Sequence, residues 1–189
     1  SLRPYPSVRP ERADGNLRMH REFSEMKIVL PLIHLDSLVF TPLPQLLLKQ
    51  QLVLDGVCAS EDVVILEFSR EDDLAAAFTE IMSHQPAIVG WSCYVWSFRA
   101  VRQVSRAIKE YSPRTKVVWG GPHVSEKPRW FAQEYASCCD YVIGWYGELS
   151  FSQLVKALRE GDADPAHIPA YTASHDASCA KAPEFDELP

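Results

Sequence analysis

In its second half the chain contains the stretch Lys116-Val117-Val118-Trp119-Gly120-Gly121-Pro122. Its β-branched and aromatic residues form a short apolar run, which predicts a buried strand that ends at the two glycines and the proline. Residues 97–111 before it have the spacing of an amphipathic helix, and residues 87–92 form another apolar run. A strand, a helix and a strand in this order favour parallel strands joined by a right-handed crossover.

The same alternation continues on both sides of this unit. We expect further strands at residues 27–33, 62–68 and 140–143, and further helices at residues 42–56, 72–83, 127–136 and 148–159. Five strands alternating with helices predict an α/β fold, a Rossmann-like or flavodoxin-like three-layer sandwich with a five-stranded parallel sheet. The expected strand order is 2-1-3-4-5.

Three local signals indicate where the helices begin and end. Gly56 can end the helix at residues 42–56, because glycine tolerates the left-handed backbone found at many helix ends. Ser97 is a candidate N-cap for the helix that follows it. Asp72 and Asp73 are expected in the first turn of their helix, where negative charge suits the helix dipole.

The two ends of the chain differ from the middle in composition. Residues 1–26 are polar and rich in proline and arginine, so we expect an extended N-terminal arm. Residues 161–189 return to Ala, Pro, Asp and Ser, which is typical of a linker. The folded domain is therefore expected at residues 27–160.

The composition excludes several classes of protein. The chain has 189 residues and 47% of them are hydrophobic, which excludes a disordered chain. Its 19 Lys and Arg against 25 Asp and Glu give a net charge of −6, which argues against binding a nucleic-acid backbone through bulk charge. No run of about 18 apolar residues occurs, so no membrane-spanning helix is expected.

The cysteines indicate a reduced protein. There are 5 of them, widely spaced and without a CxxC pair. This pattern fits neither a disulfide framework nor a zinc site. We therefore expect a cytoplasmic location.

Four loops are the candidate ligand-binding segments, because ligands of parallel α/β sheets bind beyond the carboxyl ends of the strands. They are residues 34–37, 92–96, 120–124 and 144–148. The second and the fourth are unusually aromatic for surface loops. Such a rim suits a large flat ligand.

Several residues of these loops also have a purely structural interpretation. Gly120 and Gly121 can simply turn the chain, or they can let the backbone lie against a ligand because no Cβ intervenes. Ser92 can be the partner of a helix cap or can donate its hydroxyl to a ligand. The tryptophans are more often core or partner-facing residues than cofactor contacts; they are Trp91, Trp96, Trp119 and Trp145.

Motifs for catalysis are not found in the chain. His34 and His123 lie at strand ends, but neither has a companion at metal-binding spacing. No nucleophile elbow, P-loop or GxGxxG motif occurs. We therefore predict no catalytic residue and no metal ligand in this chain.

Residues 86–154 resemble the cobalamin-binding domain that precedes the catalytic barrel of B12-dependent radical SAM enzymes. The matching segments are IVGWSCYVW at 88–96, VVWGGPHVS at 117–125, DYVI at 140–143 and GELSF at 147–151. The family has a hydrophobic strand, a serine followed by aromatic residues, a GGPH turn, a D-x-V-V strand and a G-E-x-x-F helix start. The combination is specific, although each segment is short, and the resemblance covers roughly residues 27–160.

The resemblance implies a domain that holds cobalamin at the carboxyl ends of the strands. The corrin ring would rest on the first loop and on residues 92–96. The nucleotide tail would lie beside the third strand, against Ser92 and the glycine turn. The implied cofactor-binding residues are Leu35, Asp36, Ser37, Ser92, Tyr94, Val95, Trp96, Gly120, Gly121, Pro122, His123, Gly147 and Glu148.

Two features of related proteins are absent from the sequence. Other corrinoid domains carry Asp-x-His-x-x-Gly after the first strand, with a histidine that ligates cobalt, whereas residues 34–40 lack this motif. Many radical SAM relatives also lack that histidine, and an unligated lower face is consistent with methylcobalamin in radical chemistry. The CxxxCxxC run that would hold a [4Fe–4S] cluster is also absent.

The resemblance therefore implies that S-adenosylmethionine and the [4Fe–4S] cluster belong to a separate radical SAM catalytic domain. That domain would be in the same polypeptide or in a separate subunit, and residues 182–189 resemble the linker that leads to it. We expect no catalysis by this chain alone. The leading interpretation is the cobalamin-binding domain of a methyltransferase in which methylcobalamin supplies the methyl group.

Two alternatives remain open at this point. A degenerate domain would keep the fold without cobalamin and serve as a protein-interaction subunit, as the aromatic loops and the divergent first loop suggest. A receiver or flavodoxin-like module fits less well. Ser92 takes the place of a phosphorylatable aspartate, and residues 35–38 are not a phosphate-binding loop.

Overall fold

The fold is built on one parallel sheet of five strands. This computed structural model describes residues 26–35, 41–145, 147–161 and 170–173. The strands are β1 (Ile28–His34), β2 (Val63–Ser69), β3 (Ile88–Ser92), β4 (Lys116–Gly120) and β5 (Tyr141–Val142). They are ordered β2-β1-β3-β4-β5 and every neighbouring pair is parallel. The predicted fold class and strand order are confirmed.

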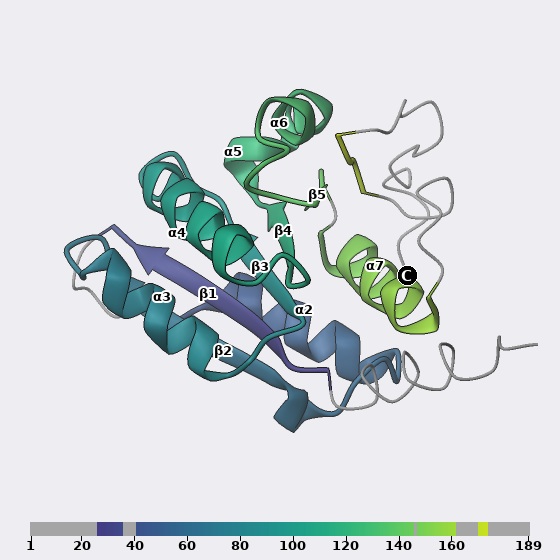
Figure 1. Ribbon diagram of the computed structural model, residues 1–189. Coiled ribbons are helices and arrows are strands. Elements are labelled where there is room, and N and C mark those ends of the chain that lie inside the picture. Colours follow the sequence, from purple (N-terminus) through teal and green to yellow (C-terminus); the bar gives the residue numbers. More distant parts are fainter. Residues whose placement is uncertain (1–25, 36–40, 146, 162–169, 174–189) are drawn as a thin grey trace, which may run out of the picture.

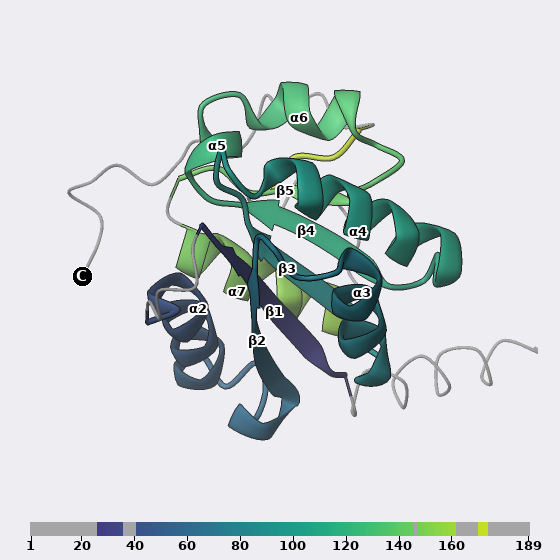
Figure 2. The ribbon, with the colours of Figure 1, turned by 90° about the vertical axis from the view of Figure 1, so that its left-hand side faces the viewer.

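Helices cover both faces of this sheet (Figures 1 and 2). Helices α2 (Leu43–Leu54) and α7 (Gly147–Glu160) lie on one face. Helices α3 (Leu74–Ser83) and α4 (Phe98–Tyr111) lie on the other. The shorter elements are η1 (Ser60–Asp62), α5 (Pro122–Ser125) and α6 (Pro128–Glu134).

Side chains that alternate along the strands divide the core into two layers. In β3, Val89 and Trp91 pack in the layer with α3 and α4, whereas Ile88 packs in the layer with α2 and α7. In β4, Trp119 belongs to the first layer and Val118 to the second. Every second residue of β3 and β4 therefore faces α2 and α7.

Two of the predicted helix starts differ from the structure in detail. Asp72 and Asp73 do not lie in the first turn of α3, which begins at Leu74. The Asp73 carboxylate instead caps the helix by accepting a hydrogen bond from the Ala75 amide at 3.0 Å. Their side chains thus hold the turn before the helix, where free backbone amides need acceptors.

Ser97 occupies the N-cap position of α4, as predicted, but its hydroxyl makes no capping hydrogen bond. It accepts a hydrogen bond from the Tyr94 amide at 3.2 Å and lies 3.3 Å from the Tyr94 carbonyl oxygen, to which it donates. The hydroxyl therefore closes the loop between β3 and α4. Gly56 follows α2 with a φ of +65°, so its predicted role at the helix end is confirmed.

The structure also contains contacts that the sequence patterns did not indicate. Helix α5 begins directly after the glycine turn, where only a loop was expected. Tyr171 forms an antiparallel bridge to Val142, with both N–H···O distances at 2.8 Å. The chain beyond Gly161 thus returns to the sheet edge at residues 170–173. The proposed N-terminal arm at 1–26, apart from Met26, lies outside the described residues.

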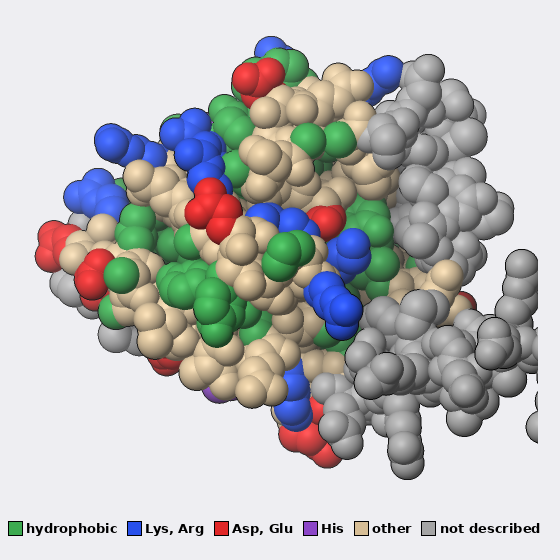
Figure 3. Space-filling model, in the orientation of Figure 1, with side chains coloured by type: hydrophobic (Ala, Val, Ile, Leu, Met, Phe, Trp, Pro, Cys, Tyr) green, Lys and Arg blue, Asp and Glu red, His purple; other side chains and the backbone are tan. Residues whose placement is uncertain are grey.

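The surface in Figure 3 carries Lys and Arg side chains interspersed with acidic and hydrophobic ones. Among the described residues, no helix has both the length and the apolarity needed to cross a membrane.

A cluster of charged groups joins α4 to the strand ends opposite the candidate ligand loops. The Lys109 ammonium donates to both Asp140 carboxylate oxygens, at 3.1 and 2.9 Å, and to the carbonyl oxygens of Pro113 and Thr115. The Asp140 carboxylate also accepts from the Val117 amide at 2.8 Å. Both charged side chains are largely buried, with 17% and 20% of their surface exposed.

We expect Lys109→Met to lower the free energy of unfolding by about 2 kcal/mol, because it leaves the Asp140 carboxylate partly buried without its main partner. Lys116→Met is the matched control. Its ammonium lies 3.6 Å from the same carboxylate but is 41% exposed, so the loss should be about 0–1 kcal/mol. Urea denaturation followed by tryptophan fluorescence measures both. Equal losses in the two variants would contradict the assignment of Lys109 as the main partner.

Candidate functional site

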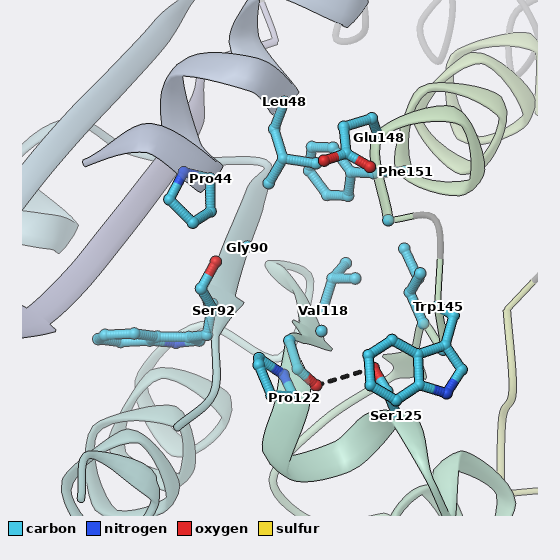
Figure 4. A pocket seen from close by; sticks show the side chains of 16 residues that line it. Pro44, Leu48, Gly90, Ser92, Val118, Pro122, Ser125, Trp145, Glu148 and Phe151 are labelled. Atoms are coloured by element: carbon cyan, nitrogen blue, oxygen red, sulfur yellow. Dashed lines mark hydrogen bonds between the residues drawn. The ribbon is translucent and has the colours of Figure 1, made fainter. Parts of the chain in front are cut away.

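A cavity of about 210 Å³ lies at the carboxyl ends of β3 and β4, between α2 and α7 (Figure 4). Helices α2 and α7 bring residues from distant parts of the sequence to the same space above the sheet. The residues that line it are Pro44, Leu48, Gly90, Trp91, Ser92, Val118, Gly120, Gly121, Pro122, Ser125, Ile143, Gly144, Trp145, Gly147, Glu148 and Phe151.

The cavity exists because small residues occupy the strand positions beneath α2 and α7. Gly90 pairs with Val118 in the sheet, and Ser92 pairs with Gly120 two residues closer to the strand ends. A Cβ added to Gly120 would lie 4.0 Å from its nearest neighbours, the Ile143 and Trp91 carbonyl oxygens. The missing Gly120 side chain therefore leaves real space in the cavity.

Gly90 is different, because its surroundings are already filled. A Cβ there would lie 2.9 Å from the Leu30 Cδ2 atom and 3.2 Å from the Phe151 ring. Phe151 lines the cavity beside Gly90, and Leu30 packs against the same glycine. The glycine in the middle of β3 thus lets Leu30 and Phe151 approach the strand.

Gly121 holds the loops after β3 and β4 together. Its φ of +92° lies in a region that other residues rarely adopt. A Cβ would lie 2.9 Å from both the N and the O atoms of Cys93. The backbones are joined there by hydrogen bonds from the Cys93 amide to the Gly120 carbonyl at 2.7 Å and from the His123 amide to the Cys93 carbonyl at 3.1 Å.

Ser92 places a hydroxyl in the cavity for which the described residues offer no hydrogen-bond partner. Its side chain lines the cavity and the residue is only 7% exposed. Within the described residues it makes no hydrogen bond, unlike Ser125, whose hydroxyl donates to the Gly121 carbonyl at 2.8 Å (Figure 4). Buried hydroxyls are normally paired, so this one is available to a bound molecule.

Glu148 is the acidic group of the cavity. It lies in the first turn of α7, where the helix dipole favours a negative charge, and Figure 4 shows its carboxylate beside Leu48 and Phe151. Trp145 lies on the opposite rim, near Ser125. The cavity therefore combines apolar walls with a hydroxyl and a carboxylate.

A second, more open hollow of about 610 Å³ lies on the other side of the glycine turn, with Pro122 common to both. Tyr94 and Trp96 form its aromatic wall, with stacked rings 4.6 Å apart between centroids and an interplanar angle of 11°. The Trp96 Nε1 donates to the Ile33 carbonyl at 3.4 Å, which ties this loop to β1. Burial raises the pKa of the Tyr94 phenol, so it stays neutral.

The buried thiols near these loops are protonated and unreactive at neutral pH. Burial raises the pKa of Cys93 well above its ordinary value. Burial also raises the pKa of Cys139, and the neighbouring Asp140 carboxylate adds to this shift. Both stay protonated at neutral pH, where a thiol is a poor nucleophile. The described residues contain no group of three or more His, Cys, Asp or Glu side chains that could hold a metal ion.

The structure gathers most of the predicted site residues around these two spaces. The first cavity brings together Ser92, Gly120, Gly121, Pro122, Gly147 and Glu148. The second hollow brings together Tyr94, Val95, Trp96, Pro122 and His123. Leu35 lines neither space and is exposed beyond β1. Asp36 and Ser37 lie outside the described residues.

The structure also places the tryptophans and His34, which the sequence analysis considered as possible site residues. Trp91 and Trp119 are core residues, whereas Trp96 and Trp145 are exposed at the two spaces. His34 lines neither space, and its Nε2 lies 2.8 Å from a Glu67 carboxylate oxygen.

Sequence reasoning did not identify several of the residues that line the two spaces. For the cavity these are Pro44, Leu48, Gly90, Val118, Ser125, Ile143 and Phe151; for the second hollow they are Glu126, Lys127, Trp130 and Phe131. Gly90 in the middle of an apolar run was the one available signal, because glycine inside a strand often marks a close approach.

Known proteins share both the sequence and the fold. Residues 38–155 match the family described as the B12 binding domain. The chain is 29% identical over 162 residues to 2-(S-pantetheinyl)-carbapenam-3-carboxylate methyltransferase of Streptantibioticus cattleyicolor, covering 83% of this chain and 23% of the relative. It is 30% identical over 105 residues to the cobalamin-dependent radical SAM methyltransferase TokK of Streptomyces tokunonensis, covering 56% and 15%.

Solved structures agree in fold. The radical S-adenosylmethionine methyltransferase TsrM from Kitasatospora setae, with cobalamin and a [4Fe-4S] cluster bound, superposes with a TM-score of 0.55 at 19% identity, covering 77% of this chain and 27% of TsrM. The cobalamin-dependent S-adenosylmethionine radical enzyme OxsB, with aqua-cobalamin bound, gives 0.55 at 16% identity, covering 80% and 21%.

The family match covers more than half of the chain, and none of these findings favours the degenerate domain over the leading interpretation. The chain spans about a quarter or less of the curated relatives named above. The chain belongs to the B12-binding domain family.

Proposed function

We propose that this chain binds cobalamin with the nucleotide tail in the cavity between α2 and α7 and the corrin ring over the carboxyl ends of the strands. The observation that carries the proposal is the hydroxyl of the buried residue Ser92, which has no hydrogen-bond partner among the described residues and lies beside the space that Gly120 leaves. A ligand with a flat apolar base and an exposed ring nitrogen fits such a space. The hydroxyl would donate to that nitrogen.

The walls of the cavity would keep water away from the tail. The walls offer apolar surface, so an aromatic base is more stable in the cavity than in water. The apolar wall residues are Pro44, Leu48, Val118 and Phe151. Gly120 lets the tail approach the backbone closely, because no Cβ intervenes. The Glu148 carboxylate would accept hydrogen bonds from ribose hydroxyls or corrin amides near the rim.

The loop after β3 would support the corrin ring. The stacked rings of Tyr94 and Trp96 form a flat apolar surface, and the hydrogen bond from Trp96 to Ile33 fixes that surface over β1. Val95 is 74% exposed in the same loop, which leaves its side chain free for contact. His123 also lines the hollow and would contact the ring edge, as would Leu35 and its neighbours Asp36 and Ser37.

We further propose that the whole protein is a B12-dependent radical SAM methyltransferase, because both curated relatives are named methyltransferases and the name of TokK adds the cobalamin-dependent radical SAM class. Methylcobalamin, when bound, would supply the methyl group. S-adenosylmethionine and a [4Fe–4S] cluster would belong to a catalytic domain in the same polypeptide or in a separate subunit. Residues 27–160 would be the cobalamin-binding domain in a cytoplasmic enzyme, and the free thiols of the described cysteines agree with a reduced compartment.

Reconstitution with methylcobalamin tests the binding proposal. We expect the purified 189-residue chain to retain the cofactor after desalting, with a visible spectrum of the base-off form because the tail leaves cobalt for the cavity. Ser92→Ala should raise the dissociation constant for methylcobalamin by about fivefold to tenfold, since it removes one hydrogen bond to the base. A colourless protein after desalting would refute the proposal.

A further inference from the structure

We infer that the cavity between α2 and α7 discriminates between cobamides by their lower base, and that it takes a benzimidazole in preference to a purine. This inference rests on the proposed function, because it concerns the same cavity. It adds the chemical class of base that the cavity accepts.

The residues of the cavity lie at different depths below the strand ends. Ser92 and Gly120 pair at the ends of β3 and β4, and Gly90 and Val118 pair two residues earlier in each strand. Side chains two residues apart point to the same face, so the second pair lies deeper along that face. The hydroxyl of Ser92 is therefore nearer the mouth, and Val118 is nearer the floor.

Helices α2 and α7 also place their lining residues at two depths. Helix α7 follows its strand and places Glu148 in its first turn at the strand ends, with Phe151 one turn deeper. In α2, Leu48 lies one turn deeper than Pro44. Among the described residues, the Ser92 hydroxyl and the Glu148 carboxylate have no hydrogen-bond partner, and both residues stand at the strand ends.

The floor is closed by apolar side chains in close contact. Leu30, Val118 and Phe151 are all buried, at 2% exposure or less. The tight surroundings of Gly90, given above, leave no room there for a water molecule beside Leu30 and Phe151. These three described side chains offer no hydrogen-bonding group to a bound base.

A benzimidazole and a purine differ at the edge that would meet this floor. Dimethylbenzimidazole presents methyl groups and aromatic carbon, which gain from contact with Leu48, Val118 and Phe151. Adenine presents ring nitrogens and an amino group, which would lose water without gaining a partner. Both bases offer a ring nitrogen to the Ser92 hydroxyl, so Ser92 does not distinguish them.

The test compares three corrinoids on the full chain: methylcobalamin, its counterpart with adenine as the lower base, and methylcobinamide, which lacks the nucleotide tail. Dissociation constants come from quenching of tryptophan fluorescence. Each is corrected for the base-off fraction of the free corrinoid, measured by acid titration, because only that fraction can insert its base. We expect methylcobalamin to bind at least about tenfold more tightly than the adenine form.

Val118→Thr tests the floor directly, because it adds one hydroxyl there with little change in volume. This variant should reduce the preference for benzimidazole severalfold. Val117→Thr is the matched control: it makes the same change in the adjacent buried residue, which packs in the other core layer. The control should keep the wild-type ratio of the two affinities.

The outcomes separate this inference from the function it rests on. Equal corrected affinities for the two bases, or tighter binding of the adenine form, would overturn the inference while leaving cobalamin binding intact. Binding of none of the three corrinoids would instead refute the proposed function and the inference together. Because the wild-type comparison needs no substitution, the inference stays testable even where Val118→Thr unfolds.

Discussion

Gly121→Ala is expected to lower the free energy of unfolding by about 3 kcal/mol. The φ of +92° is strained for any residue with a Cβ, and the new methyl group would lie 2.9 Å from two backbone atoms of Cys93. Backbone atoms cannot rotate away as a flexible side chain can. The loops after β3 and β4 would have to separate, which breaks the hydrogen bonds that join Cys93 to Gly120 and His123.

The adjacent glycine provides the control. Gly120→Ala adds the same methyl group where the nearest atoms are 4.0 Å away, so its unfolding free energy should stay within about 0.5 kcal/mol of the wild type. Urea titration followed by circular dichroism measures both variants. If Gly121→Ala were as stable as Gly120→Ala, the two glycines would be interchangeable and the strain at Gly121 would be disproved.

The alternation of strands and helices was predictable because it depends on local signals. Apolar runs such as residues 116–119 and glycines such as Gly56 act within a few residues of chain, so their periodicity is visible in the sequence. The connection lengths predicted parallel strands, the strand order was expected from a flavodoxin-like fold, and both are confirmed. The side-chain partners of Asp73 and Ser97 were not predictable in the same way, because one residue of shift in a helix start changes which amide faces the side chain.

The candidate site was predictable only where it comes from the loops after strands. Ser92 and Gly120 were identified because strand ends of a parallel sheet meet at one edge. Leu48 and Phe151 were not identified, since their place in the cavity depends on how α2 and α7 pack over the sheet. The same holds for Trp130 in the second hollow. Helix packing is a tertiary property that a single sequence does not display.

The sequence also left the role of the Gly120-Gly121 pair open between a turn and a ligand contact, and the geometry divides the two roles. Gly121 satisfies the structural interpretation, because the turn itself requires it. Gly120 has neither a positive φ nor a close neighbour, so the fold would accept a side chain there. The geometry at Gly120 therefore agrees with the ligand contact, because the glycine leaves space in the cavity that is the proposed place of the nucleotide tail.

Gly120→Val is expected to weaken cobalamin binding by up to about a hundredfold, because the two γ-methyl groups would occupy the space of the tail and force overpacking when it enters. The unfolding free energy should change little, since the same methyl groups enter a cavity in the absence of ligand. Fluorescence quenching with methylcobalamin measures the affinity, and urea titration measures the stability.

Two controls connect the loss to the tail. Methylcobinamide has the corrin ring but no nucleotide tail, so its affinity should be the same for wild type and Gly120→Val. Ala76→Val makes a comparable enlargement at an exposed position of α3, on the opposite face of the sheet, and should leave both affinities unchanged. An equal loss for both corrinoids would mean that Gly120 acts on the corrin seat. Unchanged affinity for methylcobalamin would mean that the tail lies elsewhere, because a valine in the cavity and a base in the cavity exclude each other.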